Sequence, residues 1–230
     1  MIVPALHRNP VAIDSNAHRT WRQTRPQSDW RVASRLNSMF VAAVEFGDIC
    51  CEYPILFVPM GVDEQGVAKA VAPIAAFGLN PEENLFIDEA GGWRARYMPA
   101  MLRAYPYGLA KTSDERTVIT LDEGWDGWSQ TEGQALFDGQ GQPTDYLKDI
   151  RDHLEKIDEE VQRTRLMTDL LLQNGLLQPM RFDAKVTDGP AVTVEGFLAL
   201  DDTKLDQLPD EKVVEFHRNG VLSLIHAHSI

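Results

Sequence analysis

The longest regular alternation of apolar and polar positions lies between residues 144 and 174. Eight positions there are spaced alternately three and four residues apart, which places them along one side of a helix. These positions are Leu147, Ile150, Leu154, Ile157, Val161, Thr164, Thr168 and Leu171. Oppositely charged residues four apart occupy the other faces, Thr144 or Asp145 can cap the start, and Gly175 can end the helix in the left-handed conformation. The pattern predicts a single long amphipathic helix.

The apolar stripe of this helix has two interpretations. It can form a coiled-coil seam with a second copy, giving a homodimer, or it can pack on a sheet of its own chain. Two of its eight positions are threonines, which suit a coiled-coil seam poorly. We therefore expect packing within the chain and keep the homodimer as the alternative.

Short apolar runs bounded by turn residues dominate the first half of the chain. They predict buried strands at residues 55–58, 71–79, 85–87 and 118–121. The last of these is expected to pair with residues 107–112 across the polar turn at residues 113–116. Residues 99–104 predict a short helix, because Pro99 fits the first turn of a helix. Between residues 40 and 53 we expect an extended piece followed by a helical turn that stops at Pro54.

The C-terminal part predicts a hairpin followed by helical and apolar segments. Residues 180–186 and 191–199 alternate in polarity around the turn Asp188-Gly189-Pro190, as the two strands of a hairpin do. A charged helix is expected at residues 209–217, followed by an apolar segment at residues 221–228. The fold class is therefore α+β, with a β-rich N-terminal half, a long amphipathic helix, and a C-terminal hairpin plus helices packed on it.

The first 35 residues differ in charge from the rest of the chain. They hold six arginines and two acids, a charge of +4, so the remaining residues carry 16 − 33 = −17. Little periodicity is present there, and Trp21 and Trp30 are isolated, so we expect an irregular basic extension over residues 1–35 that lies on the acidic body. The alternative is an arm for an acidic partner. Residues 36–230 are expected to form a single α+β domain, with residues 139–143 as the alternative boundary.

The overall charge limits the classes of partner. Lys and Arg number 22 against 35 Asp and Glu, a net charge of −13, which disfavours nucleic acid and anionic membrane surfaces. No apolar run approaches the roughly 18–20 residues needed to span a bilayer, so no membrane span is expected. The first 14 residues lack the pattern of a secretory signal. The two cysteines, Cys50 and Cys51, are adjacent and cannot form an ordinary structural disulfide, which favours a cytoplasmic location.

Three groups of residues are candidates for a catalytic or metal-binding site. His226 and His228 with His217 suggest a metal site, but no carboxylate or thiol is grouped with them, so we expect them to satisfy nearby carbonyls. Cys50 and Cys51 are surrounded by acids, which oppose thiolate formation, so buried and inert thiols are expected.

Paired acids are the third group, at residues 82–83, 88–89 and 122–123. They fall in predicted turns, where carboxylates are usually solvated rather than paired for acid–base work. We therefore expect neither catalytic residues nor a metal or other cofactor.

The segment from Trp93 to Tyr107 concentrates aromatic residues and arginines in an otherwise acidic chain. That mixture suits stacking of a planar group while a guanidinium holds an anion, and it is also typical of interface hot spots. The expected ligand-binding or partner-binding residues are Trp93, Arg94, Arg96, Tyr97, Arg103 and Tyr105. The alternative is structural: the aromatic rings hold a short helix to the sheet and the arginines pair with acids of the body.

Motifs distributed over most of the chain resemble the bacterial SapC-like family. They lie in order at residues 41–46, 52–55, 77–79, 83–88, 93–106, 133–138, 175–177, 217–220 and 224–228. The longest of them, Trp93 to Pro106, is the most specific. The family takes its name from a protein associated with a paracrystalline surface layer, and its members are often encoded beside TonB-dependent receptors and flavin halogenase-like proteins. The resemblance supplies no catalytic residues, and a transporter permease of the same name is unrelated.

The resemblance and the residues together predict a non-catalytic accessory or binding protein. It is expected to bind a peptide, a protein or a small ligand, with a link to the surface layer or to outer-membrane nutrient uptake. The alternative is an enzyme, or a subunit of one, that works beside modification enzymes and uses acids such as Glu83 and Asp88 or the terminal histidines. A self-associating structural protein is a third hypothesis.

Overall fold

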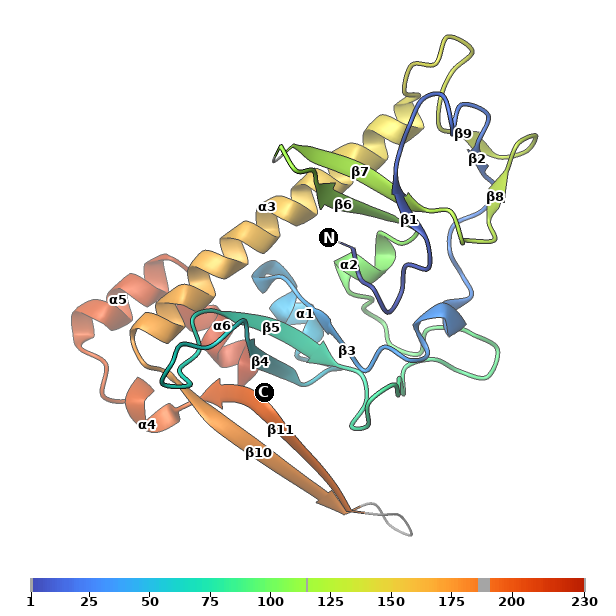
Figure 1. Cartoon of the computed structure of the whole chain (residues 1–230). Coiled ribbons are helices and arrows are strands. Elements are labelled where there is room, and N and C mark those ends of the chain that lie inside the picture. The colour runs from blue at the N-terminus through green and yellow to red at the C-terminus, as the bar shows by residue number, and fades with distance from the viewer. Residues whose placement is uncertain (1, 115, 186–190, 230) are drawn as a thin grey trace. The chain divides into compact units, whose positions relative to one another are not determined.

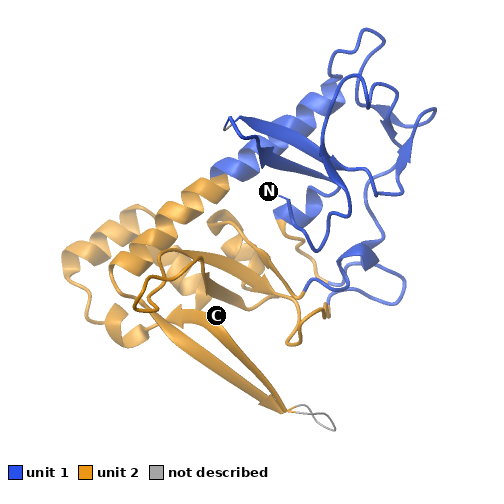
Figure 2. Ribbon diagram, in the orientation of Figure 1, with its two compact units in different colours: residues 1–36, 86–94, 100–159 blue, residues 37–85, 95–99, 160–230 orange. Residues whose placement is uncertain are grey.

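A computed structural model describes residues 2–114, 116–185 and 191–229. The predicted turn at Asp188-Gly189-Pro190 and one residue of the turn at 113–116 lie outside these ranges. The chain forms two compact units, coloured separately in Figure 2. Unit 1 comprises residues 1–36, 86–94 and 100–159, and unit 2 comprises residues 37–85, 95–99 and 160–230.

Unit 1 contains two small antiparallel sheets (Figure 1). The first has the order β1-β7-β6, with β1 at Pro10–Ala12, β6 at Tyr107–Lys111 and β7 at Thr117–Asp122. The second has the order β8-β2-β9, with β2 at Arg22–Gln23, β8 at Trp128–Ser129 and β9 at Gln134–Ala135. The pairing of β6 with β7 confirms the hairpin predicted for residues 107–121. Two short helical pieces complete the unit before the long helix: η1 at Trp30–Ala33 and α2 at Ala100–Arg103.

The first 35 residues supply strands to both of these sheets. β1 pairs with β7, and β2 lies between β8 and β9. The chain leaves unit 1 at residue 36, near the predicted end of the basic extension, but the extension shares its unit with residues far along the chain. Strands of two or three residues are too short for apolar alternation to be recognised, so the sequence did not indicate this pairing.

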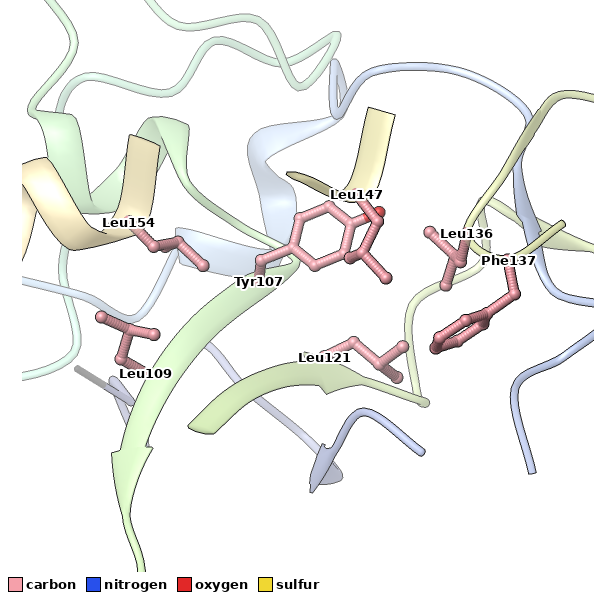
Figure 3. Close-up of a cluster of buried hydrophobic side chains, with 7 residues drawn as sticks. All are labelled: Tyr107, Leu109, Leu121, Leu136, Phe137, Leu147 and Leu154. Carbon is pink, nitrogen blue, oxygen red and sulfur yellow. The ribbon is translucent and has the colours of Figure 1, made fainter. Parts of the chain in front are cut away.

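The core of unit 1 gathers side chains from its sheet, its loops and the first half of the long helix (Figure 3). Tyr107 and Leu121 come from the paired strands β6 and β7, and Leu147 and Leu154 come from the apolar stripe predicted for the helix. All four are at most 5% exposed. The helical stripe therefore faces a core of its own chain, as expected.

Unit 2 is built on a five-stranded antiparallel sheet of order β10-β11-β4-β5-β3. The strands are β3 at Ser38–Phe40, β4 at Ile55–Pro59, β5 at Val71–Ala76, β10 at Leu177–Lys185 and β11 at Ala191–Leu200. The predicted strands near residues 55 and 71 and the C-terminal hairpin are thereby confirmed. The helical segments are η2 at Ala43–Glu45, α1 at Phe46–Ile49, α4 at Asp202–Leu205, α5 at Asp210–Arg218 and α6 at Val221–His228.

The long helix α3 runs from Asp145 to Gln173, as the periodicity predicted. Its two threonines are fully buried, and each makes a hydrogen bond to the backbone of unit 2. The Thr164 hydroxyl accepts a bond from the Ala43 amide at 2.8 Å, and the Thr168 hydroxyl donates to the Val71 carbonyl of β5 at 3.2 Å. These hydroxyls satisfy buried backbone groups that leucine would leave unpaired. No helix in the described ranges combines the length and the apolar character needed to cross a membrane.

One predicted strand is wrong. Residues 85–87 form no strand; Ile87 makes only an isolated bridge with Trp93. Turns on both sides explain the difference, because Glu82 and Gly91 adopt positive φ angles of 63° and 87°. Leu85 is 55% exposed, so the apolar run there does not mark a buried strand. The apolar segment after Gly220 is a helix, α6, which starts where Gly220 adopts φ 84°.

Candidate functional site

Unit 2 contains a cavity of about 750 Å³ on one face of its sheet. Its floor and walls are apolar and come from strands far apart in the sequence. Leu56, Ile74 and Ala76 come from β4 and β5, and Met180, Phe182 and Phe197 come from the hairpin of β10 and β11. The polar groups at its margin include Glu52, the adjacent cysteines and His228.

Strand alternation produces this apolar face. Along β5, Val71 and Ala75 are buried, whereas Ile74 and Ala76 are half-buried and line the cavity. Leu56 lies opposite Ile74 in the register of β4 with β5, so both side chains lie on the same face. Because apolar residues occupy both faces of these central strands, one set forms the interior and the other lines the cavity.

The hairpin arm extends the apolar face beyond the central strands (Figure 1). β11 pairs with β4 only at Leu198 opposite Phe57, so most of the hairpin of β10 and β11 has no further strand beside it. Met180 lies opposite Phe197 and Phe182 lies opposite Val194. Met180 and Phe182 are 42% and 50% exposed and lie two residues apart on β10, so they form part of an exposed apolar patch.

The two cysteines lie at the margin of the cavity. Both thiols approach the Gly47 carbonyl oxygen, at 3.4 Å from Cys50 and 3.5 Å from Cys51. Burial and the neighbouring Cys51 thiol raise the pKa of Cys50, which keeps it protonated and weakly nucleophilic. Cys51 is exposed and Cys50 is only half-buried, so the expectation that both thiols are buried is wrong. Both residues lie in the turn that follows α1 and precedes Pro54.

A network of hydrogen bonds connects the cavity margin to the predicted Arg96-Tyr97 pair. The Glu52 carboxylate accepts hydrogen bonds from the Arg96 amide at 2.9 and 3.0 Å and from the Tyr97 amide at 2.9 Å. These bonds lower the pKa of Glu52. The Tyr97 hydroxyl donates to Glu45 at 2.9 Å, and the Tyr53 hydroxyl donates to the Tyr97 carbonyl. Tyr97 is therefore held in place, whereas the Arg96 side chain is exposed.

The six predicted contact residues are divided between the two units. Arg96 and Tyr97 belong to unit 2, and the other four belong to unit 1. Trp93 is half-buried, stacked on Phe86 with ring centroids 6.1 Å apart, while Arg94 and Arg103 are exposed.

Tyr105, the sixth, is 4% exposed and donates its hydroxyl to Asp122 at 2.9 Å. Burial raises the pKa of Tyr105, and the bonded Asp122 carboxylate acts in the same direction.

Asp122 is fully buried, so the expectation that this acid is solvated in a turn is wrong. Its two oxygens accept bonds from three backbone amides, those of Arg8, Asn9 and Gly124, as well as from Tyr105. Burial opposes the charge, but the hydrogen bonds outweigh it and lower the pKa of Asp122. The four donors hold the Asp122 carboxylate in its ionised form, and the carboxylate in turn fixes the backbone of residues 8, 9 and 124.

The terminal histidines do not converge. His217 and His226 are exposed, whereas His228 accepts a hydrogen bond from the Leu200 amide at 3.2 Å and lies against Phe57. Burial lowers the pKa of His228. Within the described ranges, no three potential metal ligands of the His, Cys, Asp and Glu types are grouped.

Sequence reasoning identified the strands of the cavity but missed the cavity itself. Six separate segments contribute to it, and their proximity follows from the fold of unit 2 rather than from any local motif. A signal was present in β10, where Met180 and Phe182 alternate with charged residues at the end of a predicted hairpin. The exposure of these two side chains is a tertiary property that alternation does not encode.

Comparison with known proteins supports the resemblance noted in the motifs. No curated protein and no solved structure matches the chain. The family model of SapC matches residues 13–230, which covers both units and nearly the whole sequence. The chain therefore belongs to the SapC family.

Proposed function

We propose that this SapC protein is a non-catalytic binding protein that holds a small, predominantly apolar ligand in the sheet cavity of unit 2. The observation that carries the proposal is the open apolar face itself, with a cavity of about 750 Å³. Ligand pockets typically measure roughly 300–1,000 Å³ and are lined mainly by apolar and aromatic side chains. The space suits a compact organic molecule with one polar end.

Two polar groups at the margin are already engaged: Glu52 is bonded to the amides of Arg96 and Tyr97, and Nε2 of His228 accepts the Leu200 amide. Nδ1 of His228 is buried without a hydrogen-bond partner among the described residues and could bond the one polar end of a ligand, while the rest of the lining is mainly apolar. Affinity would therefore come from burying ligand surface against Leu56, Ile74 and the hairpin residues. The raised pKa of Cys50 also argues against a nucleophilic role at the margin.

Arg96, the exposed arginine of the predicted contact segment in unit 2, fits a second, macromolecular contact, because arginine is favoured where a protein surface recognises carboxylates. The adjacent cysteines favour a cytoplasmic location, and the family resemblance favours an accessory role for surface-layer or outer-membrane uptake systems. Capture of a peptide or protein partner through Arg96 extends the binding role.

Filling the cavity tests the proposal. Ala76→Trp places an indole in the cavity, and we expect binding of an apolar fluorescent dye to weaken about tenfold or more. Val62→Trp is the matched control, because Val62 is 53% exposed and does not line the cavity. Circular dichroism checks that both variants fold, and native mass spectrometry of the wild type identifies any ligand that co-purifies. Wild-type dye affinity in folded Ala76→Trp would refute the cavity as the site.

A further inference from the structure

β10 lies at one end of the five-stranded sheet of unit 2. In the described part of the chain, β10 is the terminal strand of the sheet and pairs on one side only, with β11. An edge of this kind presents unpaired backbone groups that can pair with another strand. A two-stranded hairpin is also marginally stable on its own in water, so the arm is a natural place for a further contact.

The sequence of this edge is complementary to itself. Pro179 lacks an amide hydrogen and limits pairing at one end, which leaves residues 180–184 before Lys185, the last described residue of the strand. In an antiparallel pair centred on Phe182, Met180 of one copy lies opposite Ala184 of the other. Arg181 then lies opposite Asp183, and Phe182 lies opposite Phe182. Each apolar residue meets an apolar one and each charge meets its opposite.

The two faces of the strand separate these contacts. Alternate residues of a strand point to opposite sides, so Met180 and Phe182 share one face of β10 and Arg181 and Asp183 share the other, although Arg181 also contributes to the lining of the cavity. Within one chain the Arg181 guanidinium is bonded to both oxygens of Asp183 at 2.9–3.1 Å, and both side chains are 61% exposed. In the pair of strands, each Arg181 would lie beside Asp183 of its own copy and opposite Asp183 of the other copy, so that the four charges alternate in sign.

We propose that β10 pairs antiparallel with β10 of a second copy of this chain, with the two-fold axis at Phe182. The contact joins two five-stranded sheets into one continuous sheet. It also places Phe182 of the second copy beside Phe182 of the first, at the margin of each cavity. The pairing does not depend on a ligand, so its test is separate from that of the proposed function.

A cysteine on the axis tests the geometry directly. Directly opposed residues of antiparallel strands have Cβ atoms roughly 4.5–5.5 Å apart, close enough for a disulfide after a small adjustment. In a chain whose Cys50 and Cys51 are replaced by serine, Phe182→Cys should form a covalent dimer on mild oxidation. Val62→Cys, of similar exposure, is the control and should remain a monomer. A monomer for oxidised Phe182→Cys would overturn the proposal.

Charge reversal tests the register. Arg181→Asp places like charges opposite each other, and so does Asp183→Arg, so each variant alone should dimerise about tenfold more weakly than the wild type in sedimentation measurements. When the two variants are mixed, every pair is again of opposite sign, and dimers should return. Recovery on mixing also shows that both variants kept a folded arm. Unchanged self-association of the single variants, or no recovery on mixing, would contradict the register.

Discussion

Replacing Asp122 by asparagine should destabilise unit 1 strongly, although the change removes only a charge. Oδ2 of Asp122 accepts bonds from the Arg8 amide at 3.0 Å and the Tyr105 hydroxyl at 2.9 Å. Oδ1 accepts the Asn9 amide at 2.7 Å and the Gly124 amide at 3.0 Å. An asparagine must turn its amide nitrogen towards one of these two sets of donors.

The expected loss of stability follows from the more favourable of the two orientations of the asparagine amide. With the nitrogen at the Oδ2 position, the Tyr105 hydroxyl can rotate to accept a bond, but the Arg8 amide meets another donor. Leaving one buried donor unpaired costs about 1–3 kcal/mol, and each remaining bond loses about 1 kcal/mol when its acceptor is no longer charged. With two such bonds, those of Asn9 and Gly124, we expect a loss of about 3–5 kcal/mol in the free energy of unfolding.

Intrinsic fluorescence gives a selective assay. All five tryptophans of the chain, at positions 21, 30, 93, 125 and 128, belong to unit 1, so urea unfolding followed at the indole band reports on that unit. The hydrogen bonds lower the pKa of Asp122 in the folded state. Its stabilising effect is therefore complete above the unfolded pKa of about 3.9 and is lost as the pH falls through the folded value. The difference between wild type and Asp122→Asn should narrow in that acidic range.

Two results would refute this reasoning. A loss below about 1 kcal/mol at pH 7 would show that the carboxylate charge is not needed by its four donors. A difference that stays constant on acidification would show that the lowered pKa of Asp122 does not stabilise the fold. Tyr105→Phe is the matched partial variant, because it removes one donor and keeps the charge, and it should lose less stability than Asp122→Asn.

Two further predictions concern unit 2. Thr164→Val leaves the buried Ala43 amide without its acceptor and should lower the free energy of unfolding by about 1–3 kcal/mol in circular dichroism melts. Thr164→Ser keeps the hydroxyl and should lose less stability. Equal losses for the two variants would assign the effect to packing. In Cys51→Ser, burial still raises the pKa of Cys50, so its alkylation should reach half-maximal rate at a higher pH than that of an unfolded control peptide; equal pH profiles would contradict this.

The sequence predicts helices and strands best where the pattern of apolar residues is long and local. The stripe from Leu147 to Leu171 identified a helix that the structure places at residues 145–173. The strands near residues 55, 71, 107 and 118 and the C-terminal hairpin were also found, because apolar runs and turn residues mark them locally. The strand expected at residues 85–87 was wrong because an apolar run alone does not distinguish a buried strand from a loop with exposed Leu85.

The site was beyond sequence reasoning for a different reason. The cavity depends on strand order, which brings Leu56, Ile74 and Phe182 to one face from segments separated by many residues. The aromatic and arginine segment was found by composition, but composition does not reveal that Tyr97 is held by Glu45 or that Tyr105 is buried against Asp122. The threonines of the helical stripe argue against a coiled-coil seam in the sequence, but only the structure shows that they are acceptor and donor for buried backbone groups.

The chain passes between its two units five times, at residues 36, 85, 94, 99 and 159. Neither unit therefore corresponds to an uninterrupted stretch of the gene, and no single truncation isolates one of them. A shortened product that ends in α3 after residue 159 would lose strands β10 and β11 of unit 2, but it would keep every segment of unit 1 together with parts of unit 2. Deletion mapping of this protein would give misleading boundaries, and point substitutions such as those above are the appropriate way to separate the roles of the two units.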